Sequence, residues 1–172
     1  TASHCVTLGM QSSQKQKEVA ADVAKANIAV LPLPQTNLFL QGREISTATP
    51  RAITAIKALK DAGVLVAAGA DNVQDPFNLV GRSDPLETAS LLILAAHETP
   101  GNAYKMVSTD ARKVMNLEKA DLSAGSLADF IAIDAPSVRG AIADAPMSRK
   151  IFKGGLLISS SLQTTQMSPE GL

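Results

Sequence analysis

Three short strand-like runs alternate with two helical segments in the first part of the chain, and this order constrains the fold most. The runs cover residues 1–6, 28–32 and 64–68, and the last consists of two valines, a leucine and two alanines, as in a buried strand. Helices are expected from Ser12 or Ser13 to about Asn27, and again from Thr49-Pro50 to Gly63. Strands joined by helical crossovers pair in parallel, so the sequence predicts an α/β fold.

The remaining segments follow other patterns. Residues 33–48 are expected to form a long loop. Asp84-Pro85-Leu86-Glu87 has the pattern of a capping box with a proline in the first turn. Further elements are then predicted: helices at about 85–98, 100–107 and 109–116, strands at 129–134 and 150–158 with a hairpin turn at Gly154-Gly155, and a loosely ordered polar tail from Ser159.

Composition excludes several classes of protein. Sixteen acidic residues balance sixteen basic ones and no basic run occurs, which argues against a nucleic-acid partner. The longest apolar stretch, 91–96, is too short to span a bilayer, so no membrane partner is expected. The single cysteine fits a reducing compartment, and we expect a cytoplasmic protein. Because the chain opens on a strand end without an initiator Met, we interpret it as a piece of a longer protein.

Two polar residues stand where chemistry is expected in a parallel α/β fold. Asp71 follows the third strand and His4 closes the first. The carboxyl ends of parallel strands meet at one edge, so both side chains can emerge there. An imidazole facing a carboxylate suits metal-assisted hydrolysis. The plainer alternative is that His4 is an ordinary polar residue near a terminus, and His97, inside a predicted helix, is interpreted as structural.

Several motifs in a fixed order resemble the carboxyl-terminal half of the amidohydrolase superfamily, specifically its cytosine deaminase-like branch. The later stretch 122–134 resembles the passage from the barrel of these enzymes into a small β-sandwich, and 150–158 resembles the strand pair that closes the sandwich. The motifs nearest the proposed site are S3-H-C5, N37-L-F-L-Q-G-R43, G69-A-D-N-V-Q-D-P-F77 and G81-R-S-D-P-L-E87.

The resemblance implies a fold and a division of the chain. These enzymes have a TIM-like (β/α)8 metallo-dependent hydrolase barrel and a small β-sandwich domain. On that basis residues 1–120 supply the last three barrel strands, residues 121–160 supply part of the sandwich, and residues 161–172 form the polar tail.

The resemblance also implies roles for individual residues. Asp71 matches the aspartate that ligates the metal and accepts the proton of the attacking water, and His4 matches the histidine that orients the water or the substrate carbon. Asn72 and Phe77 fall where the family's loop borders the substrate ring. The implied reaction is hydrolysis of an amidine-like ring carbon with loss of ammonia, in which a divalent metal, zinc or iron, activates the water.

The sequence lacks other parts of the family's centre. The H-x-H pair of the first barrel strand is absent, and so is the histidine of the fifth strand with an acid three residues later, because the chain holds two histidines in all. A catalytic metal site needs three protein ligands and an open position. This chain alone is therefore expected to be inactive and to hold a metal weakly. Gln41 and Arg43 match a loop whose role we interpret as structural.

These implications define the predicted function. We expect hydrolytic deamination of cytosine or a related amino-heterocycle, with the missing amino-terminal half of the barrel as a partner. The strand edge left unpaired also predicts self-association, including a homo-oligomer. Two alternatives stay open: hydrolysis of another cyclic amide or triazine-type ring, and a non-catalytic interaction protein that keeps the half-barrel scaffold.

Overall fold

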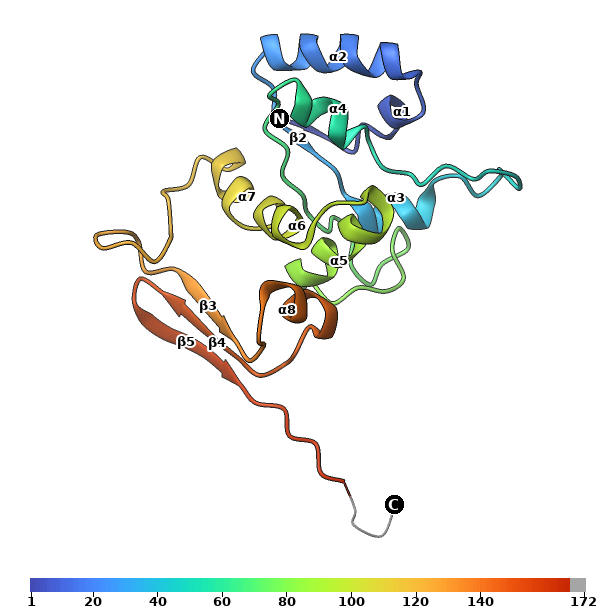
Figure 1. Cartoon of the computed structure of the whole chain (residues 1–172). Helices are drawn as coiled ribbons and strands as arrows, with labels where there is room; N and C mark the ends of the chain where they lie inside the picture. Colours follow the sequence, from blue (N-terminus) through green and yellow to red (C-terminus); the bar gives the residue numbers. More distant parts are fainter. Residues whose placement is uncertain (168–172) are drawn as a thin grey trace. The chain divides into compact units, whose positions relative to one another are not determined.

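The chain divides into two compact units in the computed structural model, which describes residues 1–167. Unit 1 comprises Thr1–Glu118, and unit 2 begins at Lys119. Unit 1 is a mixed α/β unit with parallel pairing, and unit 2 contains an antiparallel sheet (Figure 1).

The parallel pairing predicted for the first three runs is confirmed in unit 1. β1 (Ala2–Ser3) pairs in parallel with β2 (Val30–Leu31), and Val30 also forms a parallel bridge to Val66. All three strands are shorter than predicted. The first ends early because His4 and Cys5 have positive φ angles of 62° and 50°, which turn the chain out of the extended conformation.

Helical crossovers connect these parallel segments. α1 (Val6–Gly9) and α2 (Ser13–Lys25) lie between β1 and β2. The start of α2 was predicted correctly: the Ser12 side chain caps it by accepting a hydrogen bond from the backbone nitrogen of Lys15 at 3.3 Å. α2 packs beside α4 (Ile56–Asp61), which leads towards Val66 (Figure 1).

Two predictions for the segment between β2 and Val66 were wrong. Residues 33–48 are not all loop, because α3 (Pro34–Leu40) occupies the first half. The helix expected from Thr49 begins only at Ile56. The Thr49 hydroxyl donates to the carbonyl of Ile45 at 2.6 Å instead of capping a helix, and Ala52 has a φ of 55°, which helical residues do not adopt.

The end of α4 was predicted correctly at Gly63. Its backbone nitrogen donates to Lys60 at 2.9 Å, and the nitrogen of Val64 donates to Leu59 at 3.0 Å. With a φ of 83° at Gly63, these two bonds form a Schellman motif. Leu59 and Val64 are both buried, which supplies the hydrophobic contact that accompanies this motif.

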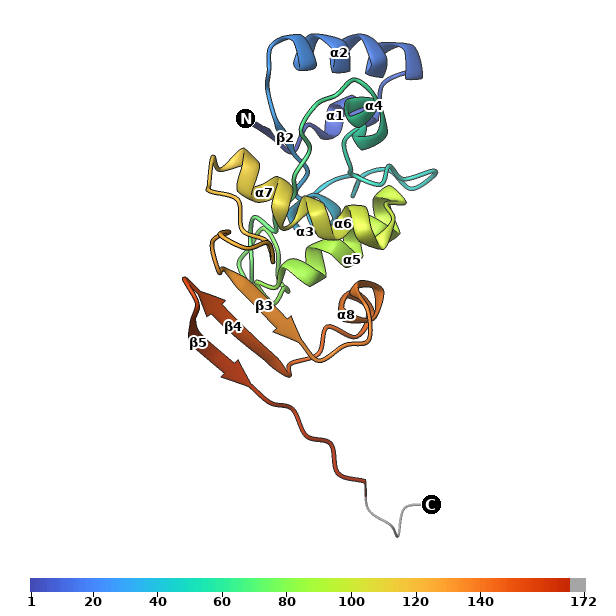
Figure 2. The same cartoon turned by 60° about the vertical axis from the view of Figure 1, so that its left-hand side comes forward.

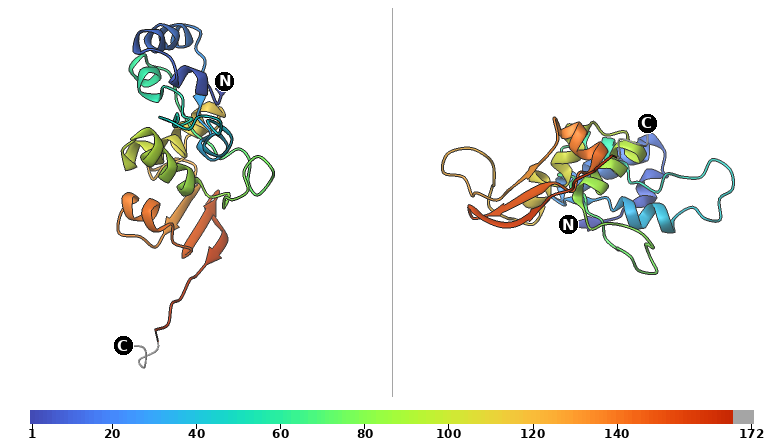
Figure 3. Two further views of the ribbon diagram at one scale, coloured as in Figure 1. Left: turned by 90° about the vertical axis from the view of Figure 1, so that its right-hand side faces the viewer. Right: turned by 90° about the horizontal axis from the view of Figure 1, so that it is seen from below.

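Three helices complete unit 1: α5 (Pro85–Ala96), α6 (Pro100–Met106) and α7 (Thr109–Val114). Asp84 caps α5 as predicted, by accepting from the nitrogen of Leu86 at 3.0 Å, but Glu87 reaches the nitrogen of Arg82 instead of that of Asp84. The core contains the fully buried side chains of Leu59, Leu92 and Met106. Figure 3 shows two loops that project from this unit, one between α3 and α4 and one before α5.

Unit 2 contains the antiparallel strands β3 (Phe130–Ile133), β4 (Arg149–Lys153) and β5 (Leu156–Ser161), with β4 in the middle (Figure 2). The hairpin turn at Gly154-Gly155 is confirmed. Two details differ from the sequence prediction: α8 (Val138–Asp144) lies between β3 and β4, and β5 extends through residues 159–161 of the expected polar tail. The last part of that tail, 168–172, lies outside the described residues.

Candidate active site

His4 lies directly after β1, where its backbone nitrogen donates to the carbonyl of Leu31 at 2.9 Å. The left-handed φ of 62° ends the strand at this residue. Its ring is held on one side by Asn37 of α3, with 2.8 Å between Nδ1 of His4 and Oδ1 of Asn37. The ring orientation therefore depends on a contact between two segments that are 33 residues apart in sequence.

Asp71 lies beyond the third parallel segment, after the small residues 67–70. Its φ of 69° turns the chain there, as happens at His4. Nε2 of His4 lies 3.7 Å from Oδ2 of Asp71, and the two side chains are 44% and 33% exposed. The structure thus brings the two predicted residues together at one edge of the parallel segments, within reach of solvent. Their catalytic roles stay a prediction.

The loop after Asp71 is organised by one carboxylate. Asp75 accepts hydrogen bonds from the side-chain nitrogen of Asn72 at 2.5 Å and from the backbone nitrogens of Phe77 and Asn78 at 2.9 and 3.0 Å. The bond from Asn72, followed by the two backbone bonds, lowers the pKa of Asp75 below its usual value of 3.8. The loop therefore has a defined conformation at neutral pH.

This loop places the two residues predicted to border a substrate. Asn72 uses its side-chain nitrogen to hold Asp75, so part of its hydrogen-bonding capacity serves the loop itself. The ring of Phe77 is 55% exposed. Exposed aromatic side chains offer flat apolar surface to a planar ring. Substrate contact by Asn72 and Phe77 stays a prediction.

Helix α3 supplies polar contacts that the sequence analysis missed. Three consecutive residues, Gln35, Thr36 and Asn37, are buried. Thr36 Oγ1 accepts from the backbone nitrogen of Asn72 at 3.0 Å, and Asn37 contacts His4. One helix therefore holds both sides of the site. The signal in the sequence was a proline followed by three polar residues, since proline is common in the first turn of helices.

The other residues singled out in the sequence lie elsewhere in unit 1. His97 is at the end of α5, exposed and not inside the helix as expected, with its Nε2 against the guanidinium of Arg51. Arg43 folds back on α3: its Nε donates to the carbonyl of Phe39 at 2.8 Å, and its guanidinium carbon lies 4.3 Å from the centre of the Phe39 ring. These contacts agree with a structural role for Arg43.

The donors present fit a divalent metal in kind but are too few in number. An imidazole and a carboxylate are ordinary ligands of zinc and iron. Among residues 1–167, however, no group of three histidine, cysteine or carboxylate side chains is placed to hold a metal ion. Burial raises the pKa of the nearby Cys5 thiol, which disfavours the thiolate that metals require. The described residues therefore do not by themselves form a complete metal centre.

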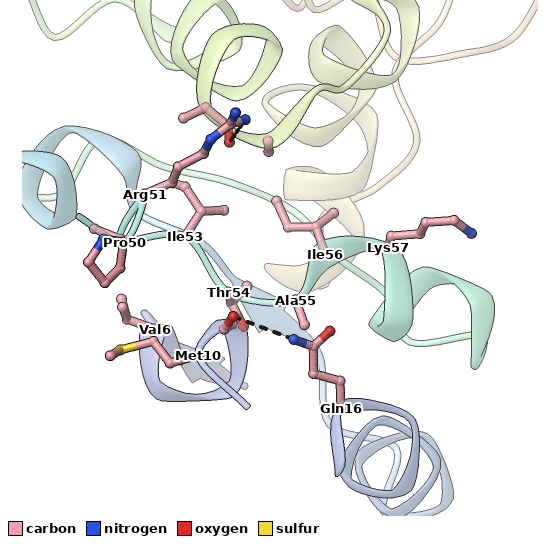
Figure 4. Close-up of a pocket in the computed structure, with 14 residues that line it drawn as sticks. Val6, Met10, Gln16, Pro50, Arg51, Ile53, Thr54, Ala55, Ile56 and Lys57 are labelled. Carbon is pink, nitrogen blue, oxygen red and sulfur yellow. Dashed lines mark hydrogen bonds between the residues drawn. The ribbon is translucent and has the colours of Figure 1, made fainter. Parts of the chain in front are cut away.

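Two cavities lie in this region of unit 1. One of about 250 Å³ borders Asp71 and is lined by residues of the Asp71 loop and of α5, among them Val73, Asp84 and Thr88. Another, of about 530 Å³, is lined by α1 residues and by the segment before α4 (Figure 4). The larger one does not include His4 or Asp71 among its lining residues, so size alone does not identify the site.

Comparison with known proteins identifies the family. The sequence model described as "Amidohydrolase family" matches residues 1–150. The chain belongs to this family. It is 29% identical over 167 residues to a pterin deaminase of Rhizobium rhizogenes (strain K84), an alignment that covers 94% of this chain and 38% of that protein.

Solved structures agree with this amidohydrolase assignment at the level of the fold. The chain matches 5-methylcytosine deaminase from Klebsiella pneumoniae, liganded with 5-fluorocytosine, with a TM-score of 0.85 and 20% identity, over 98% of this chain and 42% of that one. It also matches N-isopropylammelide isopropylaminohydrolase from Burkholderia multivorans, with a TM-score of 0.76 and 23% identity, over 92% and 38%. The amidohydrolase chain therefore spans about two fifths of these relatives. Within residues 1–167, no helix combines the length and hydropathy needed to cross a bilayer.

Proposed function

We propose that this chain is the carboxyl-terminal part of a metal-dependent amidohydrolase that deaminates an amino-heterocycle, cytosine or a related ring. In this proposal unit 1 supplies the last three strands of a (β/α)8 barrel, and unit 2 supplies part of the small β-sandwich. The amino-terminal part of the barrel would bring the remaining metal ligands. The observation that carries the proposal is the distance of 3.7 Å between Nε2 of His4 and Oδ2 of Asp71, at the ends of segments that pair in parallel with the same strand.

The two side chains suit the attack of water on an amidine-like carbon. The carboxylate of Asp71 accepts a proton as the water oxygen bonds to the ring carbon. The attack moves the electron pair of the ring C=N bond onto the ring nitrogen. The proton held by Asp71 then passes to the amino group, the carbon–nitrogen bond breaks and ammonia leaves. The remaining hydroxyl proton moves to the ring nitrogen as the ring carbon becomes a carbonyl. His4 holds the water or the substrate in line for this attack. A divalent metal, with Asp71 as one of its ligands, would supply the acidity that makes the water reactive at neutral pH.

The relatives support the class of reaction, but they do not identify the heterocyclic ring of the substrate. A pterin deaminase is among the proteins that the sequence matches, and a 5-methylcytosine deaminase is among the matching structures. Both names describe removal of an amino group from a heterocycle. Cytosine, 5-methylcytosine and a pterin are therefore the first substrates to assay.

The test is Asp71→Asn in a protein that carries this chain together with the complete barrel. Asparagine has nearly the same size, so circular dichroism should be unchanged, but it cannot accept the proton. We expect kcat for ammonia release to fall by about 10²–10⁴-fold, with a partial loss of bound metal. Phe77→Ala is the matched comparison, because the exposed ring is proposed to contact substrate, and it should raise KM more than it lowers kcat. A folded Asp71→Asn enzyme with near-normal turnover would refute the mechanism and favour a non-catalytic scaffold.

A further inference from the structure

Asn37 makes the contact that fixes the state of the His4 ring. It lies in α3, the residue is 2% exposed, and its Oδ1 is 2.8 Å from Nδ1 of His4. A carbonyl oxygen can only accept a hydrogen bond, so with Oδ1 facing the ring this contact is a hydrogen bond only when Nδ1 carries the hydrogen. A buried amide oxygen that lost this partner would be left as an unsatisfied acceptor, which destabilises the folded chain.

The other ring nitrogen faces Asp71. Its separation from Oδ2 of Asp71, 3.7 Å, is longer than the 2.7–3.2 Å of a direct N–H···O bond, so the two groups leave a gap between them. In a neutral ring with hydrogen on Nδ1, Nε2 carries a lone pair. A lone pair and a carboxylate oxygen, both acceptors, then face one gap, and this arrangement suits a ligand that brings hydrogens, such as a water molecule.

We infer that Asn37 is a positioning residue that keeps a hydrogen on Nδ1 of His4 and directs Nε2 at the gap beside Asp71. The inference deepens the proposed function, because it assigns His4 the role of an acceptor towards the attacking water. Asn37 itself touches neither substrate nor water in this scheme. It acts through the ring of His4, as residues behind catalytic histidines do when they set which nitrogen carries the proton.

The chain offers a matched control in the same helix. Gln35 is also a buried amide of α3, and its Nε2 donates to Thr88 Oγ1 at 2.7 Å. Both Gln35 and Asn37 keep one side-chain atom without a partner among the described residues, Oε1 in the first and Nδ2 in the second. Asn37→Leu and Gln35→Met therefore remove similar buried polar groups, and only the first removes the contact with His4.

The experiment is long-range ¹H–¹⁵N correlation NMR on the ¹⁵N-labelled chain, without metal or substrate, about two pH units above the ordinary histidine pKa of 6.5. The chain has two histidines, so His97→Gln assigns the signals. We expect His4 to carry its hydrogen on Nδ1. Asn37→Leu should lower the ratio of the Nδ1–H to the Nε2–H form about fivefold or more, the change produced by a net hydrogen bond of about 1 kcal/mol. Gln35→Met should leave the ratio unchanged.

A wild-type His4 protonated mainly on Nε2 would overturn the inference, and so would a ratio that does not respond to Asn37→Leu. The first can be read from the wild type alone, so the question is decided even if the variant does not fold. An equal response to Gln35→Met would show a general effect of loosening α3 and would also overturn it. The measurement needs no activity. Failure of the deaminase proposal in the Asp71→Asn assay and failure of this tautomer assignment can therefore be told apart.

Discussion

Gly63 and Gly101 allow the backbone of unit 1 to be tested by a matched pair of substitutions. A Cβ added at either glycine would meet no atom within 4 Å, so alanine causes no clash at either position. They differ in conformation: Gly63 has a φ of 83° at the end of α4, whereas Gly101 lies in the first turn of α6 without a positive φ. The comparison therefore isolates the backbone from packing.

The expected changes in the free energy of unfolding have opposite signs. Alanine in the left-handed region lowers the free energy of unfolding by about 1–2 kcal/mol. Its lower conformational entropy in the unfolded chain raises the free energy of unfolding by about 0.4–1 kcal/mol. Gly63→Ala should therefore destabilise unit 1 by about 0.5–1 kcal/mol. In α6, alanine has the better helix propensity, and Gly101→Ala should stabilise by about 0.5 kcal/mol.

Urea unfolding followed by tyrosine fluorescence measures this difference for unit 1. The sequence has one tyrosine, Tyr104 in α6, and no tryptophan. With a urea dependence of about 1.5 kcal/mol per molar, the midpoint should fall by about 0.3–0.7 M in Gly63→Ala and rise by about 0.3 M in Gly101→Ala. Equal shifts in the two variants, or a midpoint that rises in Gly63→Ala, would refute the assigned Schellman motif at Gly63.

Two further predictions concern the site. Calorimetric titration of the 172-residue chain with zinc should show weak binding, because the described residues offer too few ligands. Tight one-to-one binding would mean that ligands come from elsewhere, such as a second copy of the chain. The amide resonances of Phe77 and Asn78 should shift at a pH below 3.8, as Asp75 takes up a proton. Because the pKa of Asp75 is lowered in the folded chain, its contribution to stability is complete above pH 3.8 and is lost as the pH falls through the lowered pKa. A midpoint at or above 3.8 would contradict the bonds to Asp75, and Asp75→Asn is the control in which the titration should vanish.

The parts of the fold that could be predicted are those in which the local sequence pattern agrees with the surroundings of the segment in the folded chain. The alternation of strands and helices gave the parallel order of the first, second and third segments, and the caps at Ser12 and Asp84 gave two helix starts. Each of these caps acts within a few residues. It therefore needs no knowledge of the tertiary structure.

Helix α3 was missed because its pattern is reversed. Gln35, Thr36 and Asn37 are buried, whereas Leu38 and Leu40 are 39% and 36% exposed. A search for apolar residues at helical spacing cannot find a helix that buries its polar face. The reversal has a physical cause, since these buried polar groups meet His4, Asn72 and Thr88, which come from other segments.

α8 was missed for a different reason. Gly140 stands inside the helix, where glycine costs about 1 kcal/mol relative to alanine. The side chain of Ser137 offsets part of this cost by accepting a hydrogen bond from the backbone nitrogen of Gly140 at 3.0 Å. The cap was visible in the sequence, but the helix after it has a weak propensity of its own.

The described residues order the His4 and Asp71 side of the candidate site by themselves, but they do not supply enough ligands for a metal centre. Asn37 sets the ring of His4, Thr36 fixes the backbone at Asn72, and both belong to one short helix, so the two edges of the gap between His4 and Asp71 are tied to the same element. None of these contacts needs a metal. Loss of α3 contacts should therefore disorder the orientation of the acceptors, whereas in the proposed function the remaining metal ligands come from the amino-terminal part of the barrel. For that reason a correctly oriented His4 and Asp71 can coexist here with weak metal binding, and the NMR and calorimetric experiments test the two properties separately.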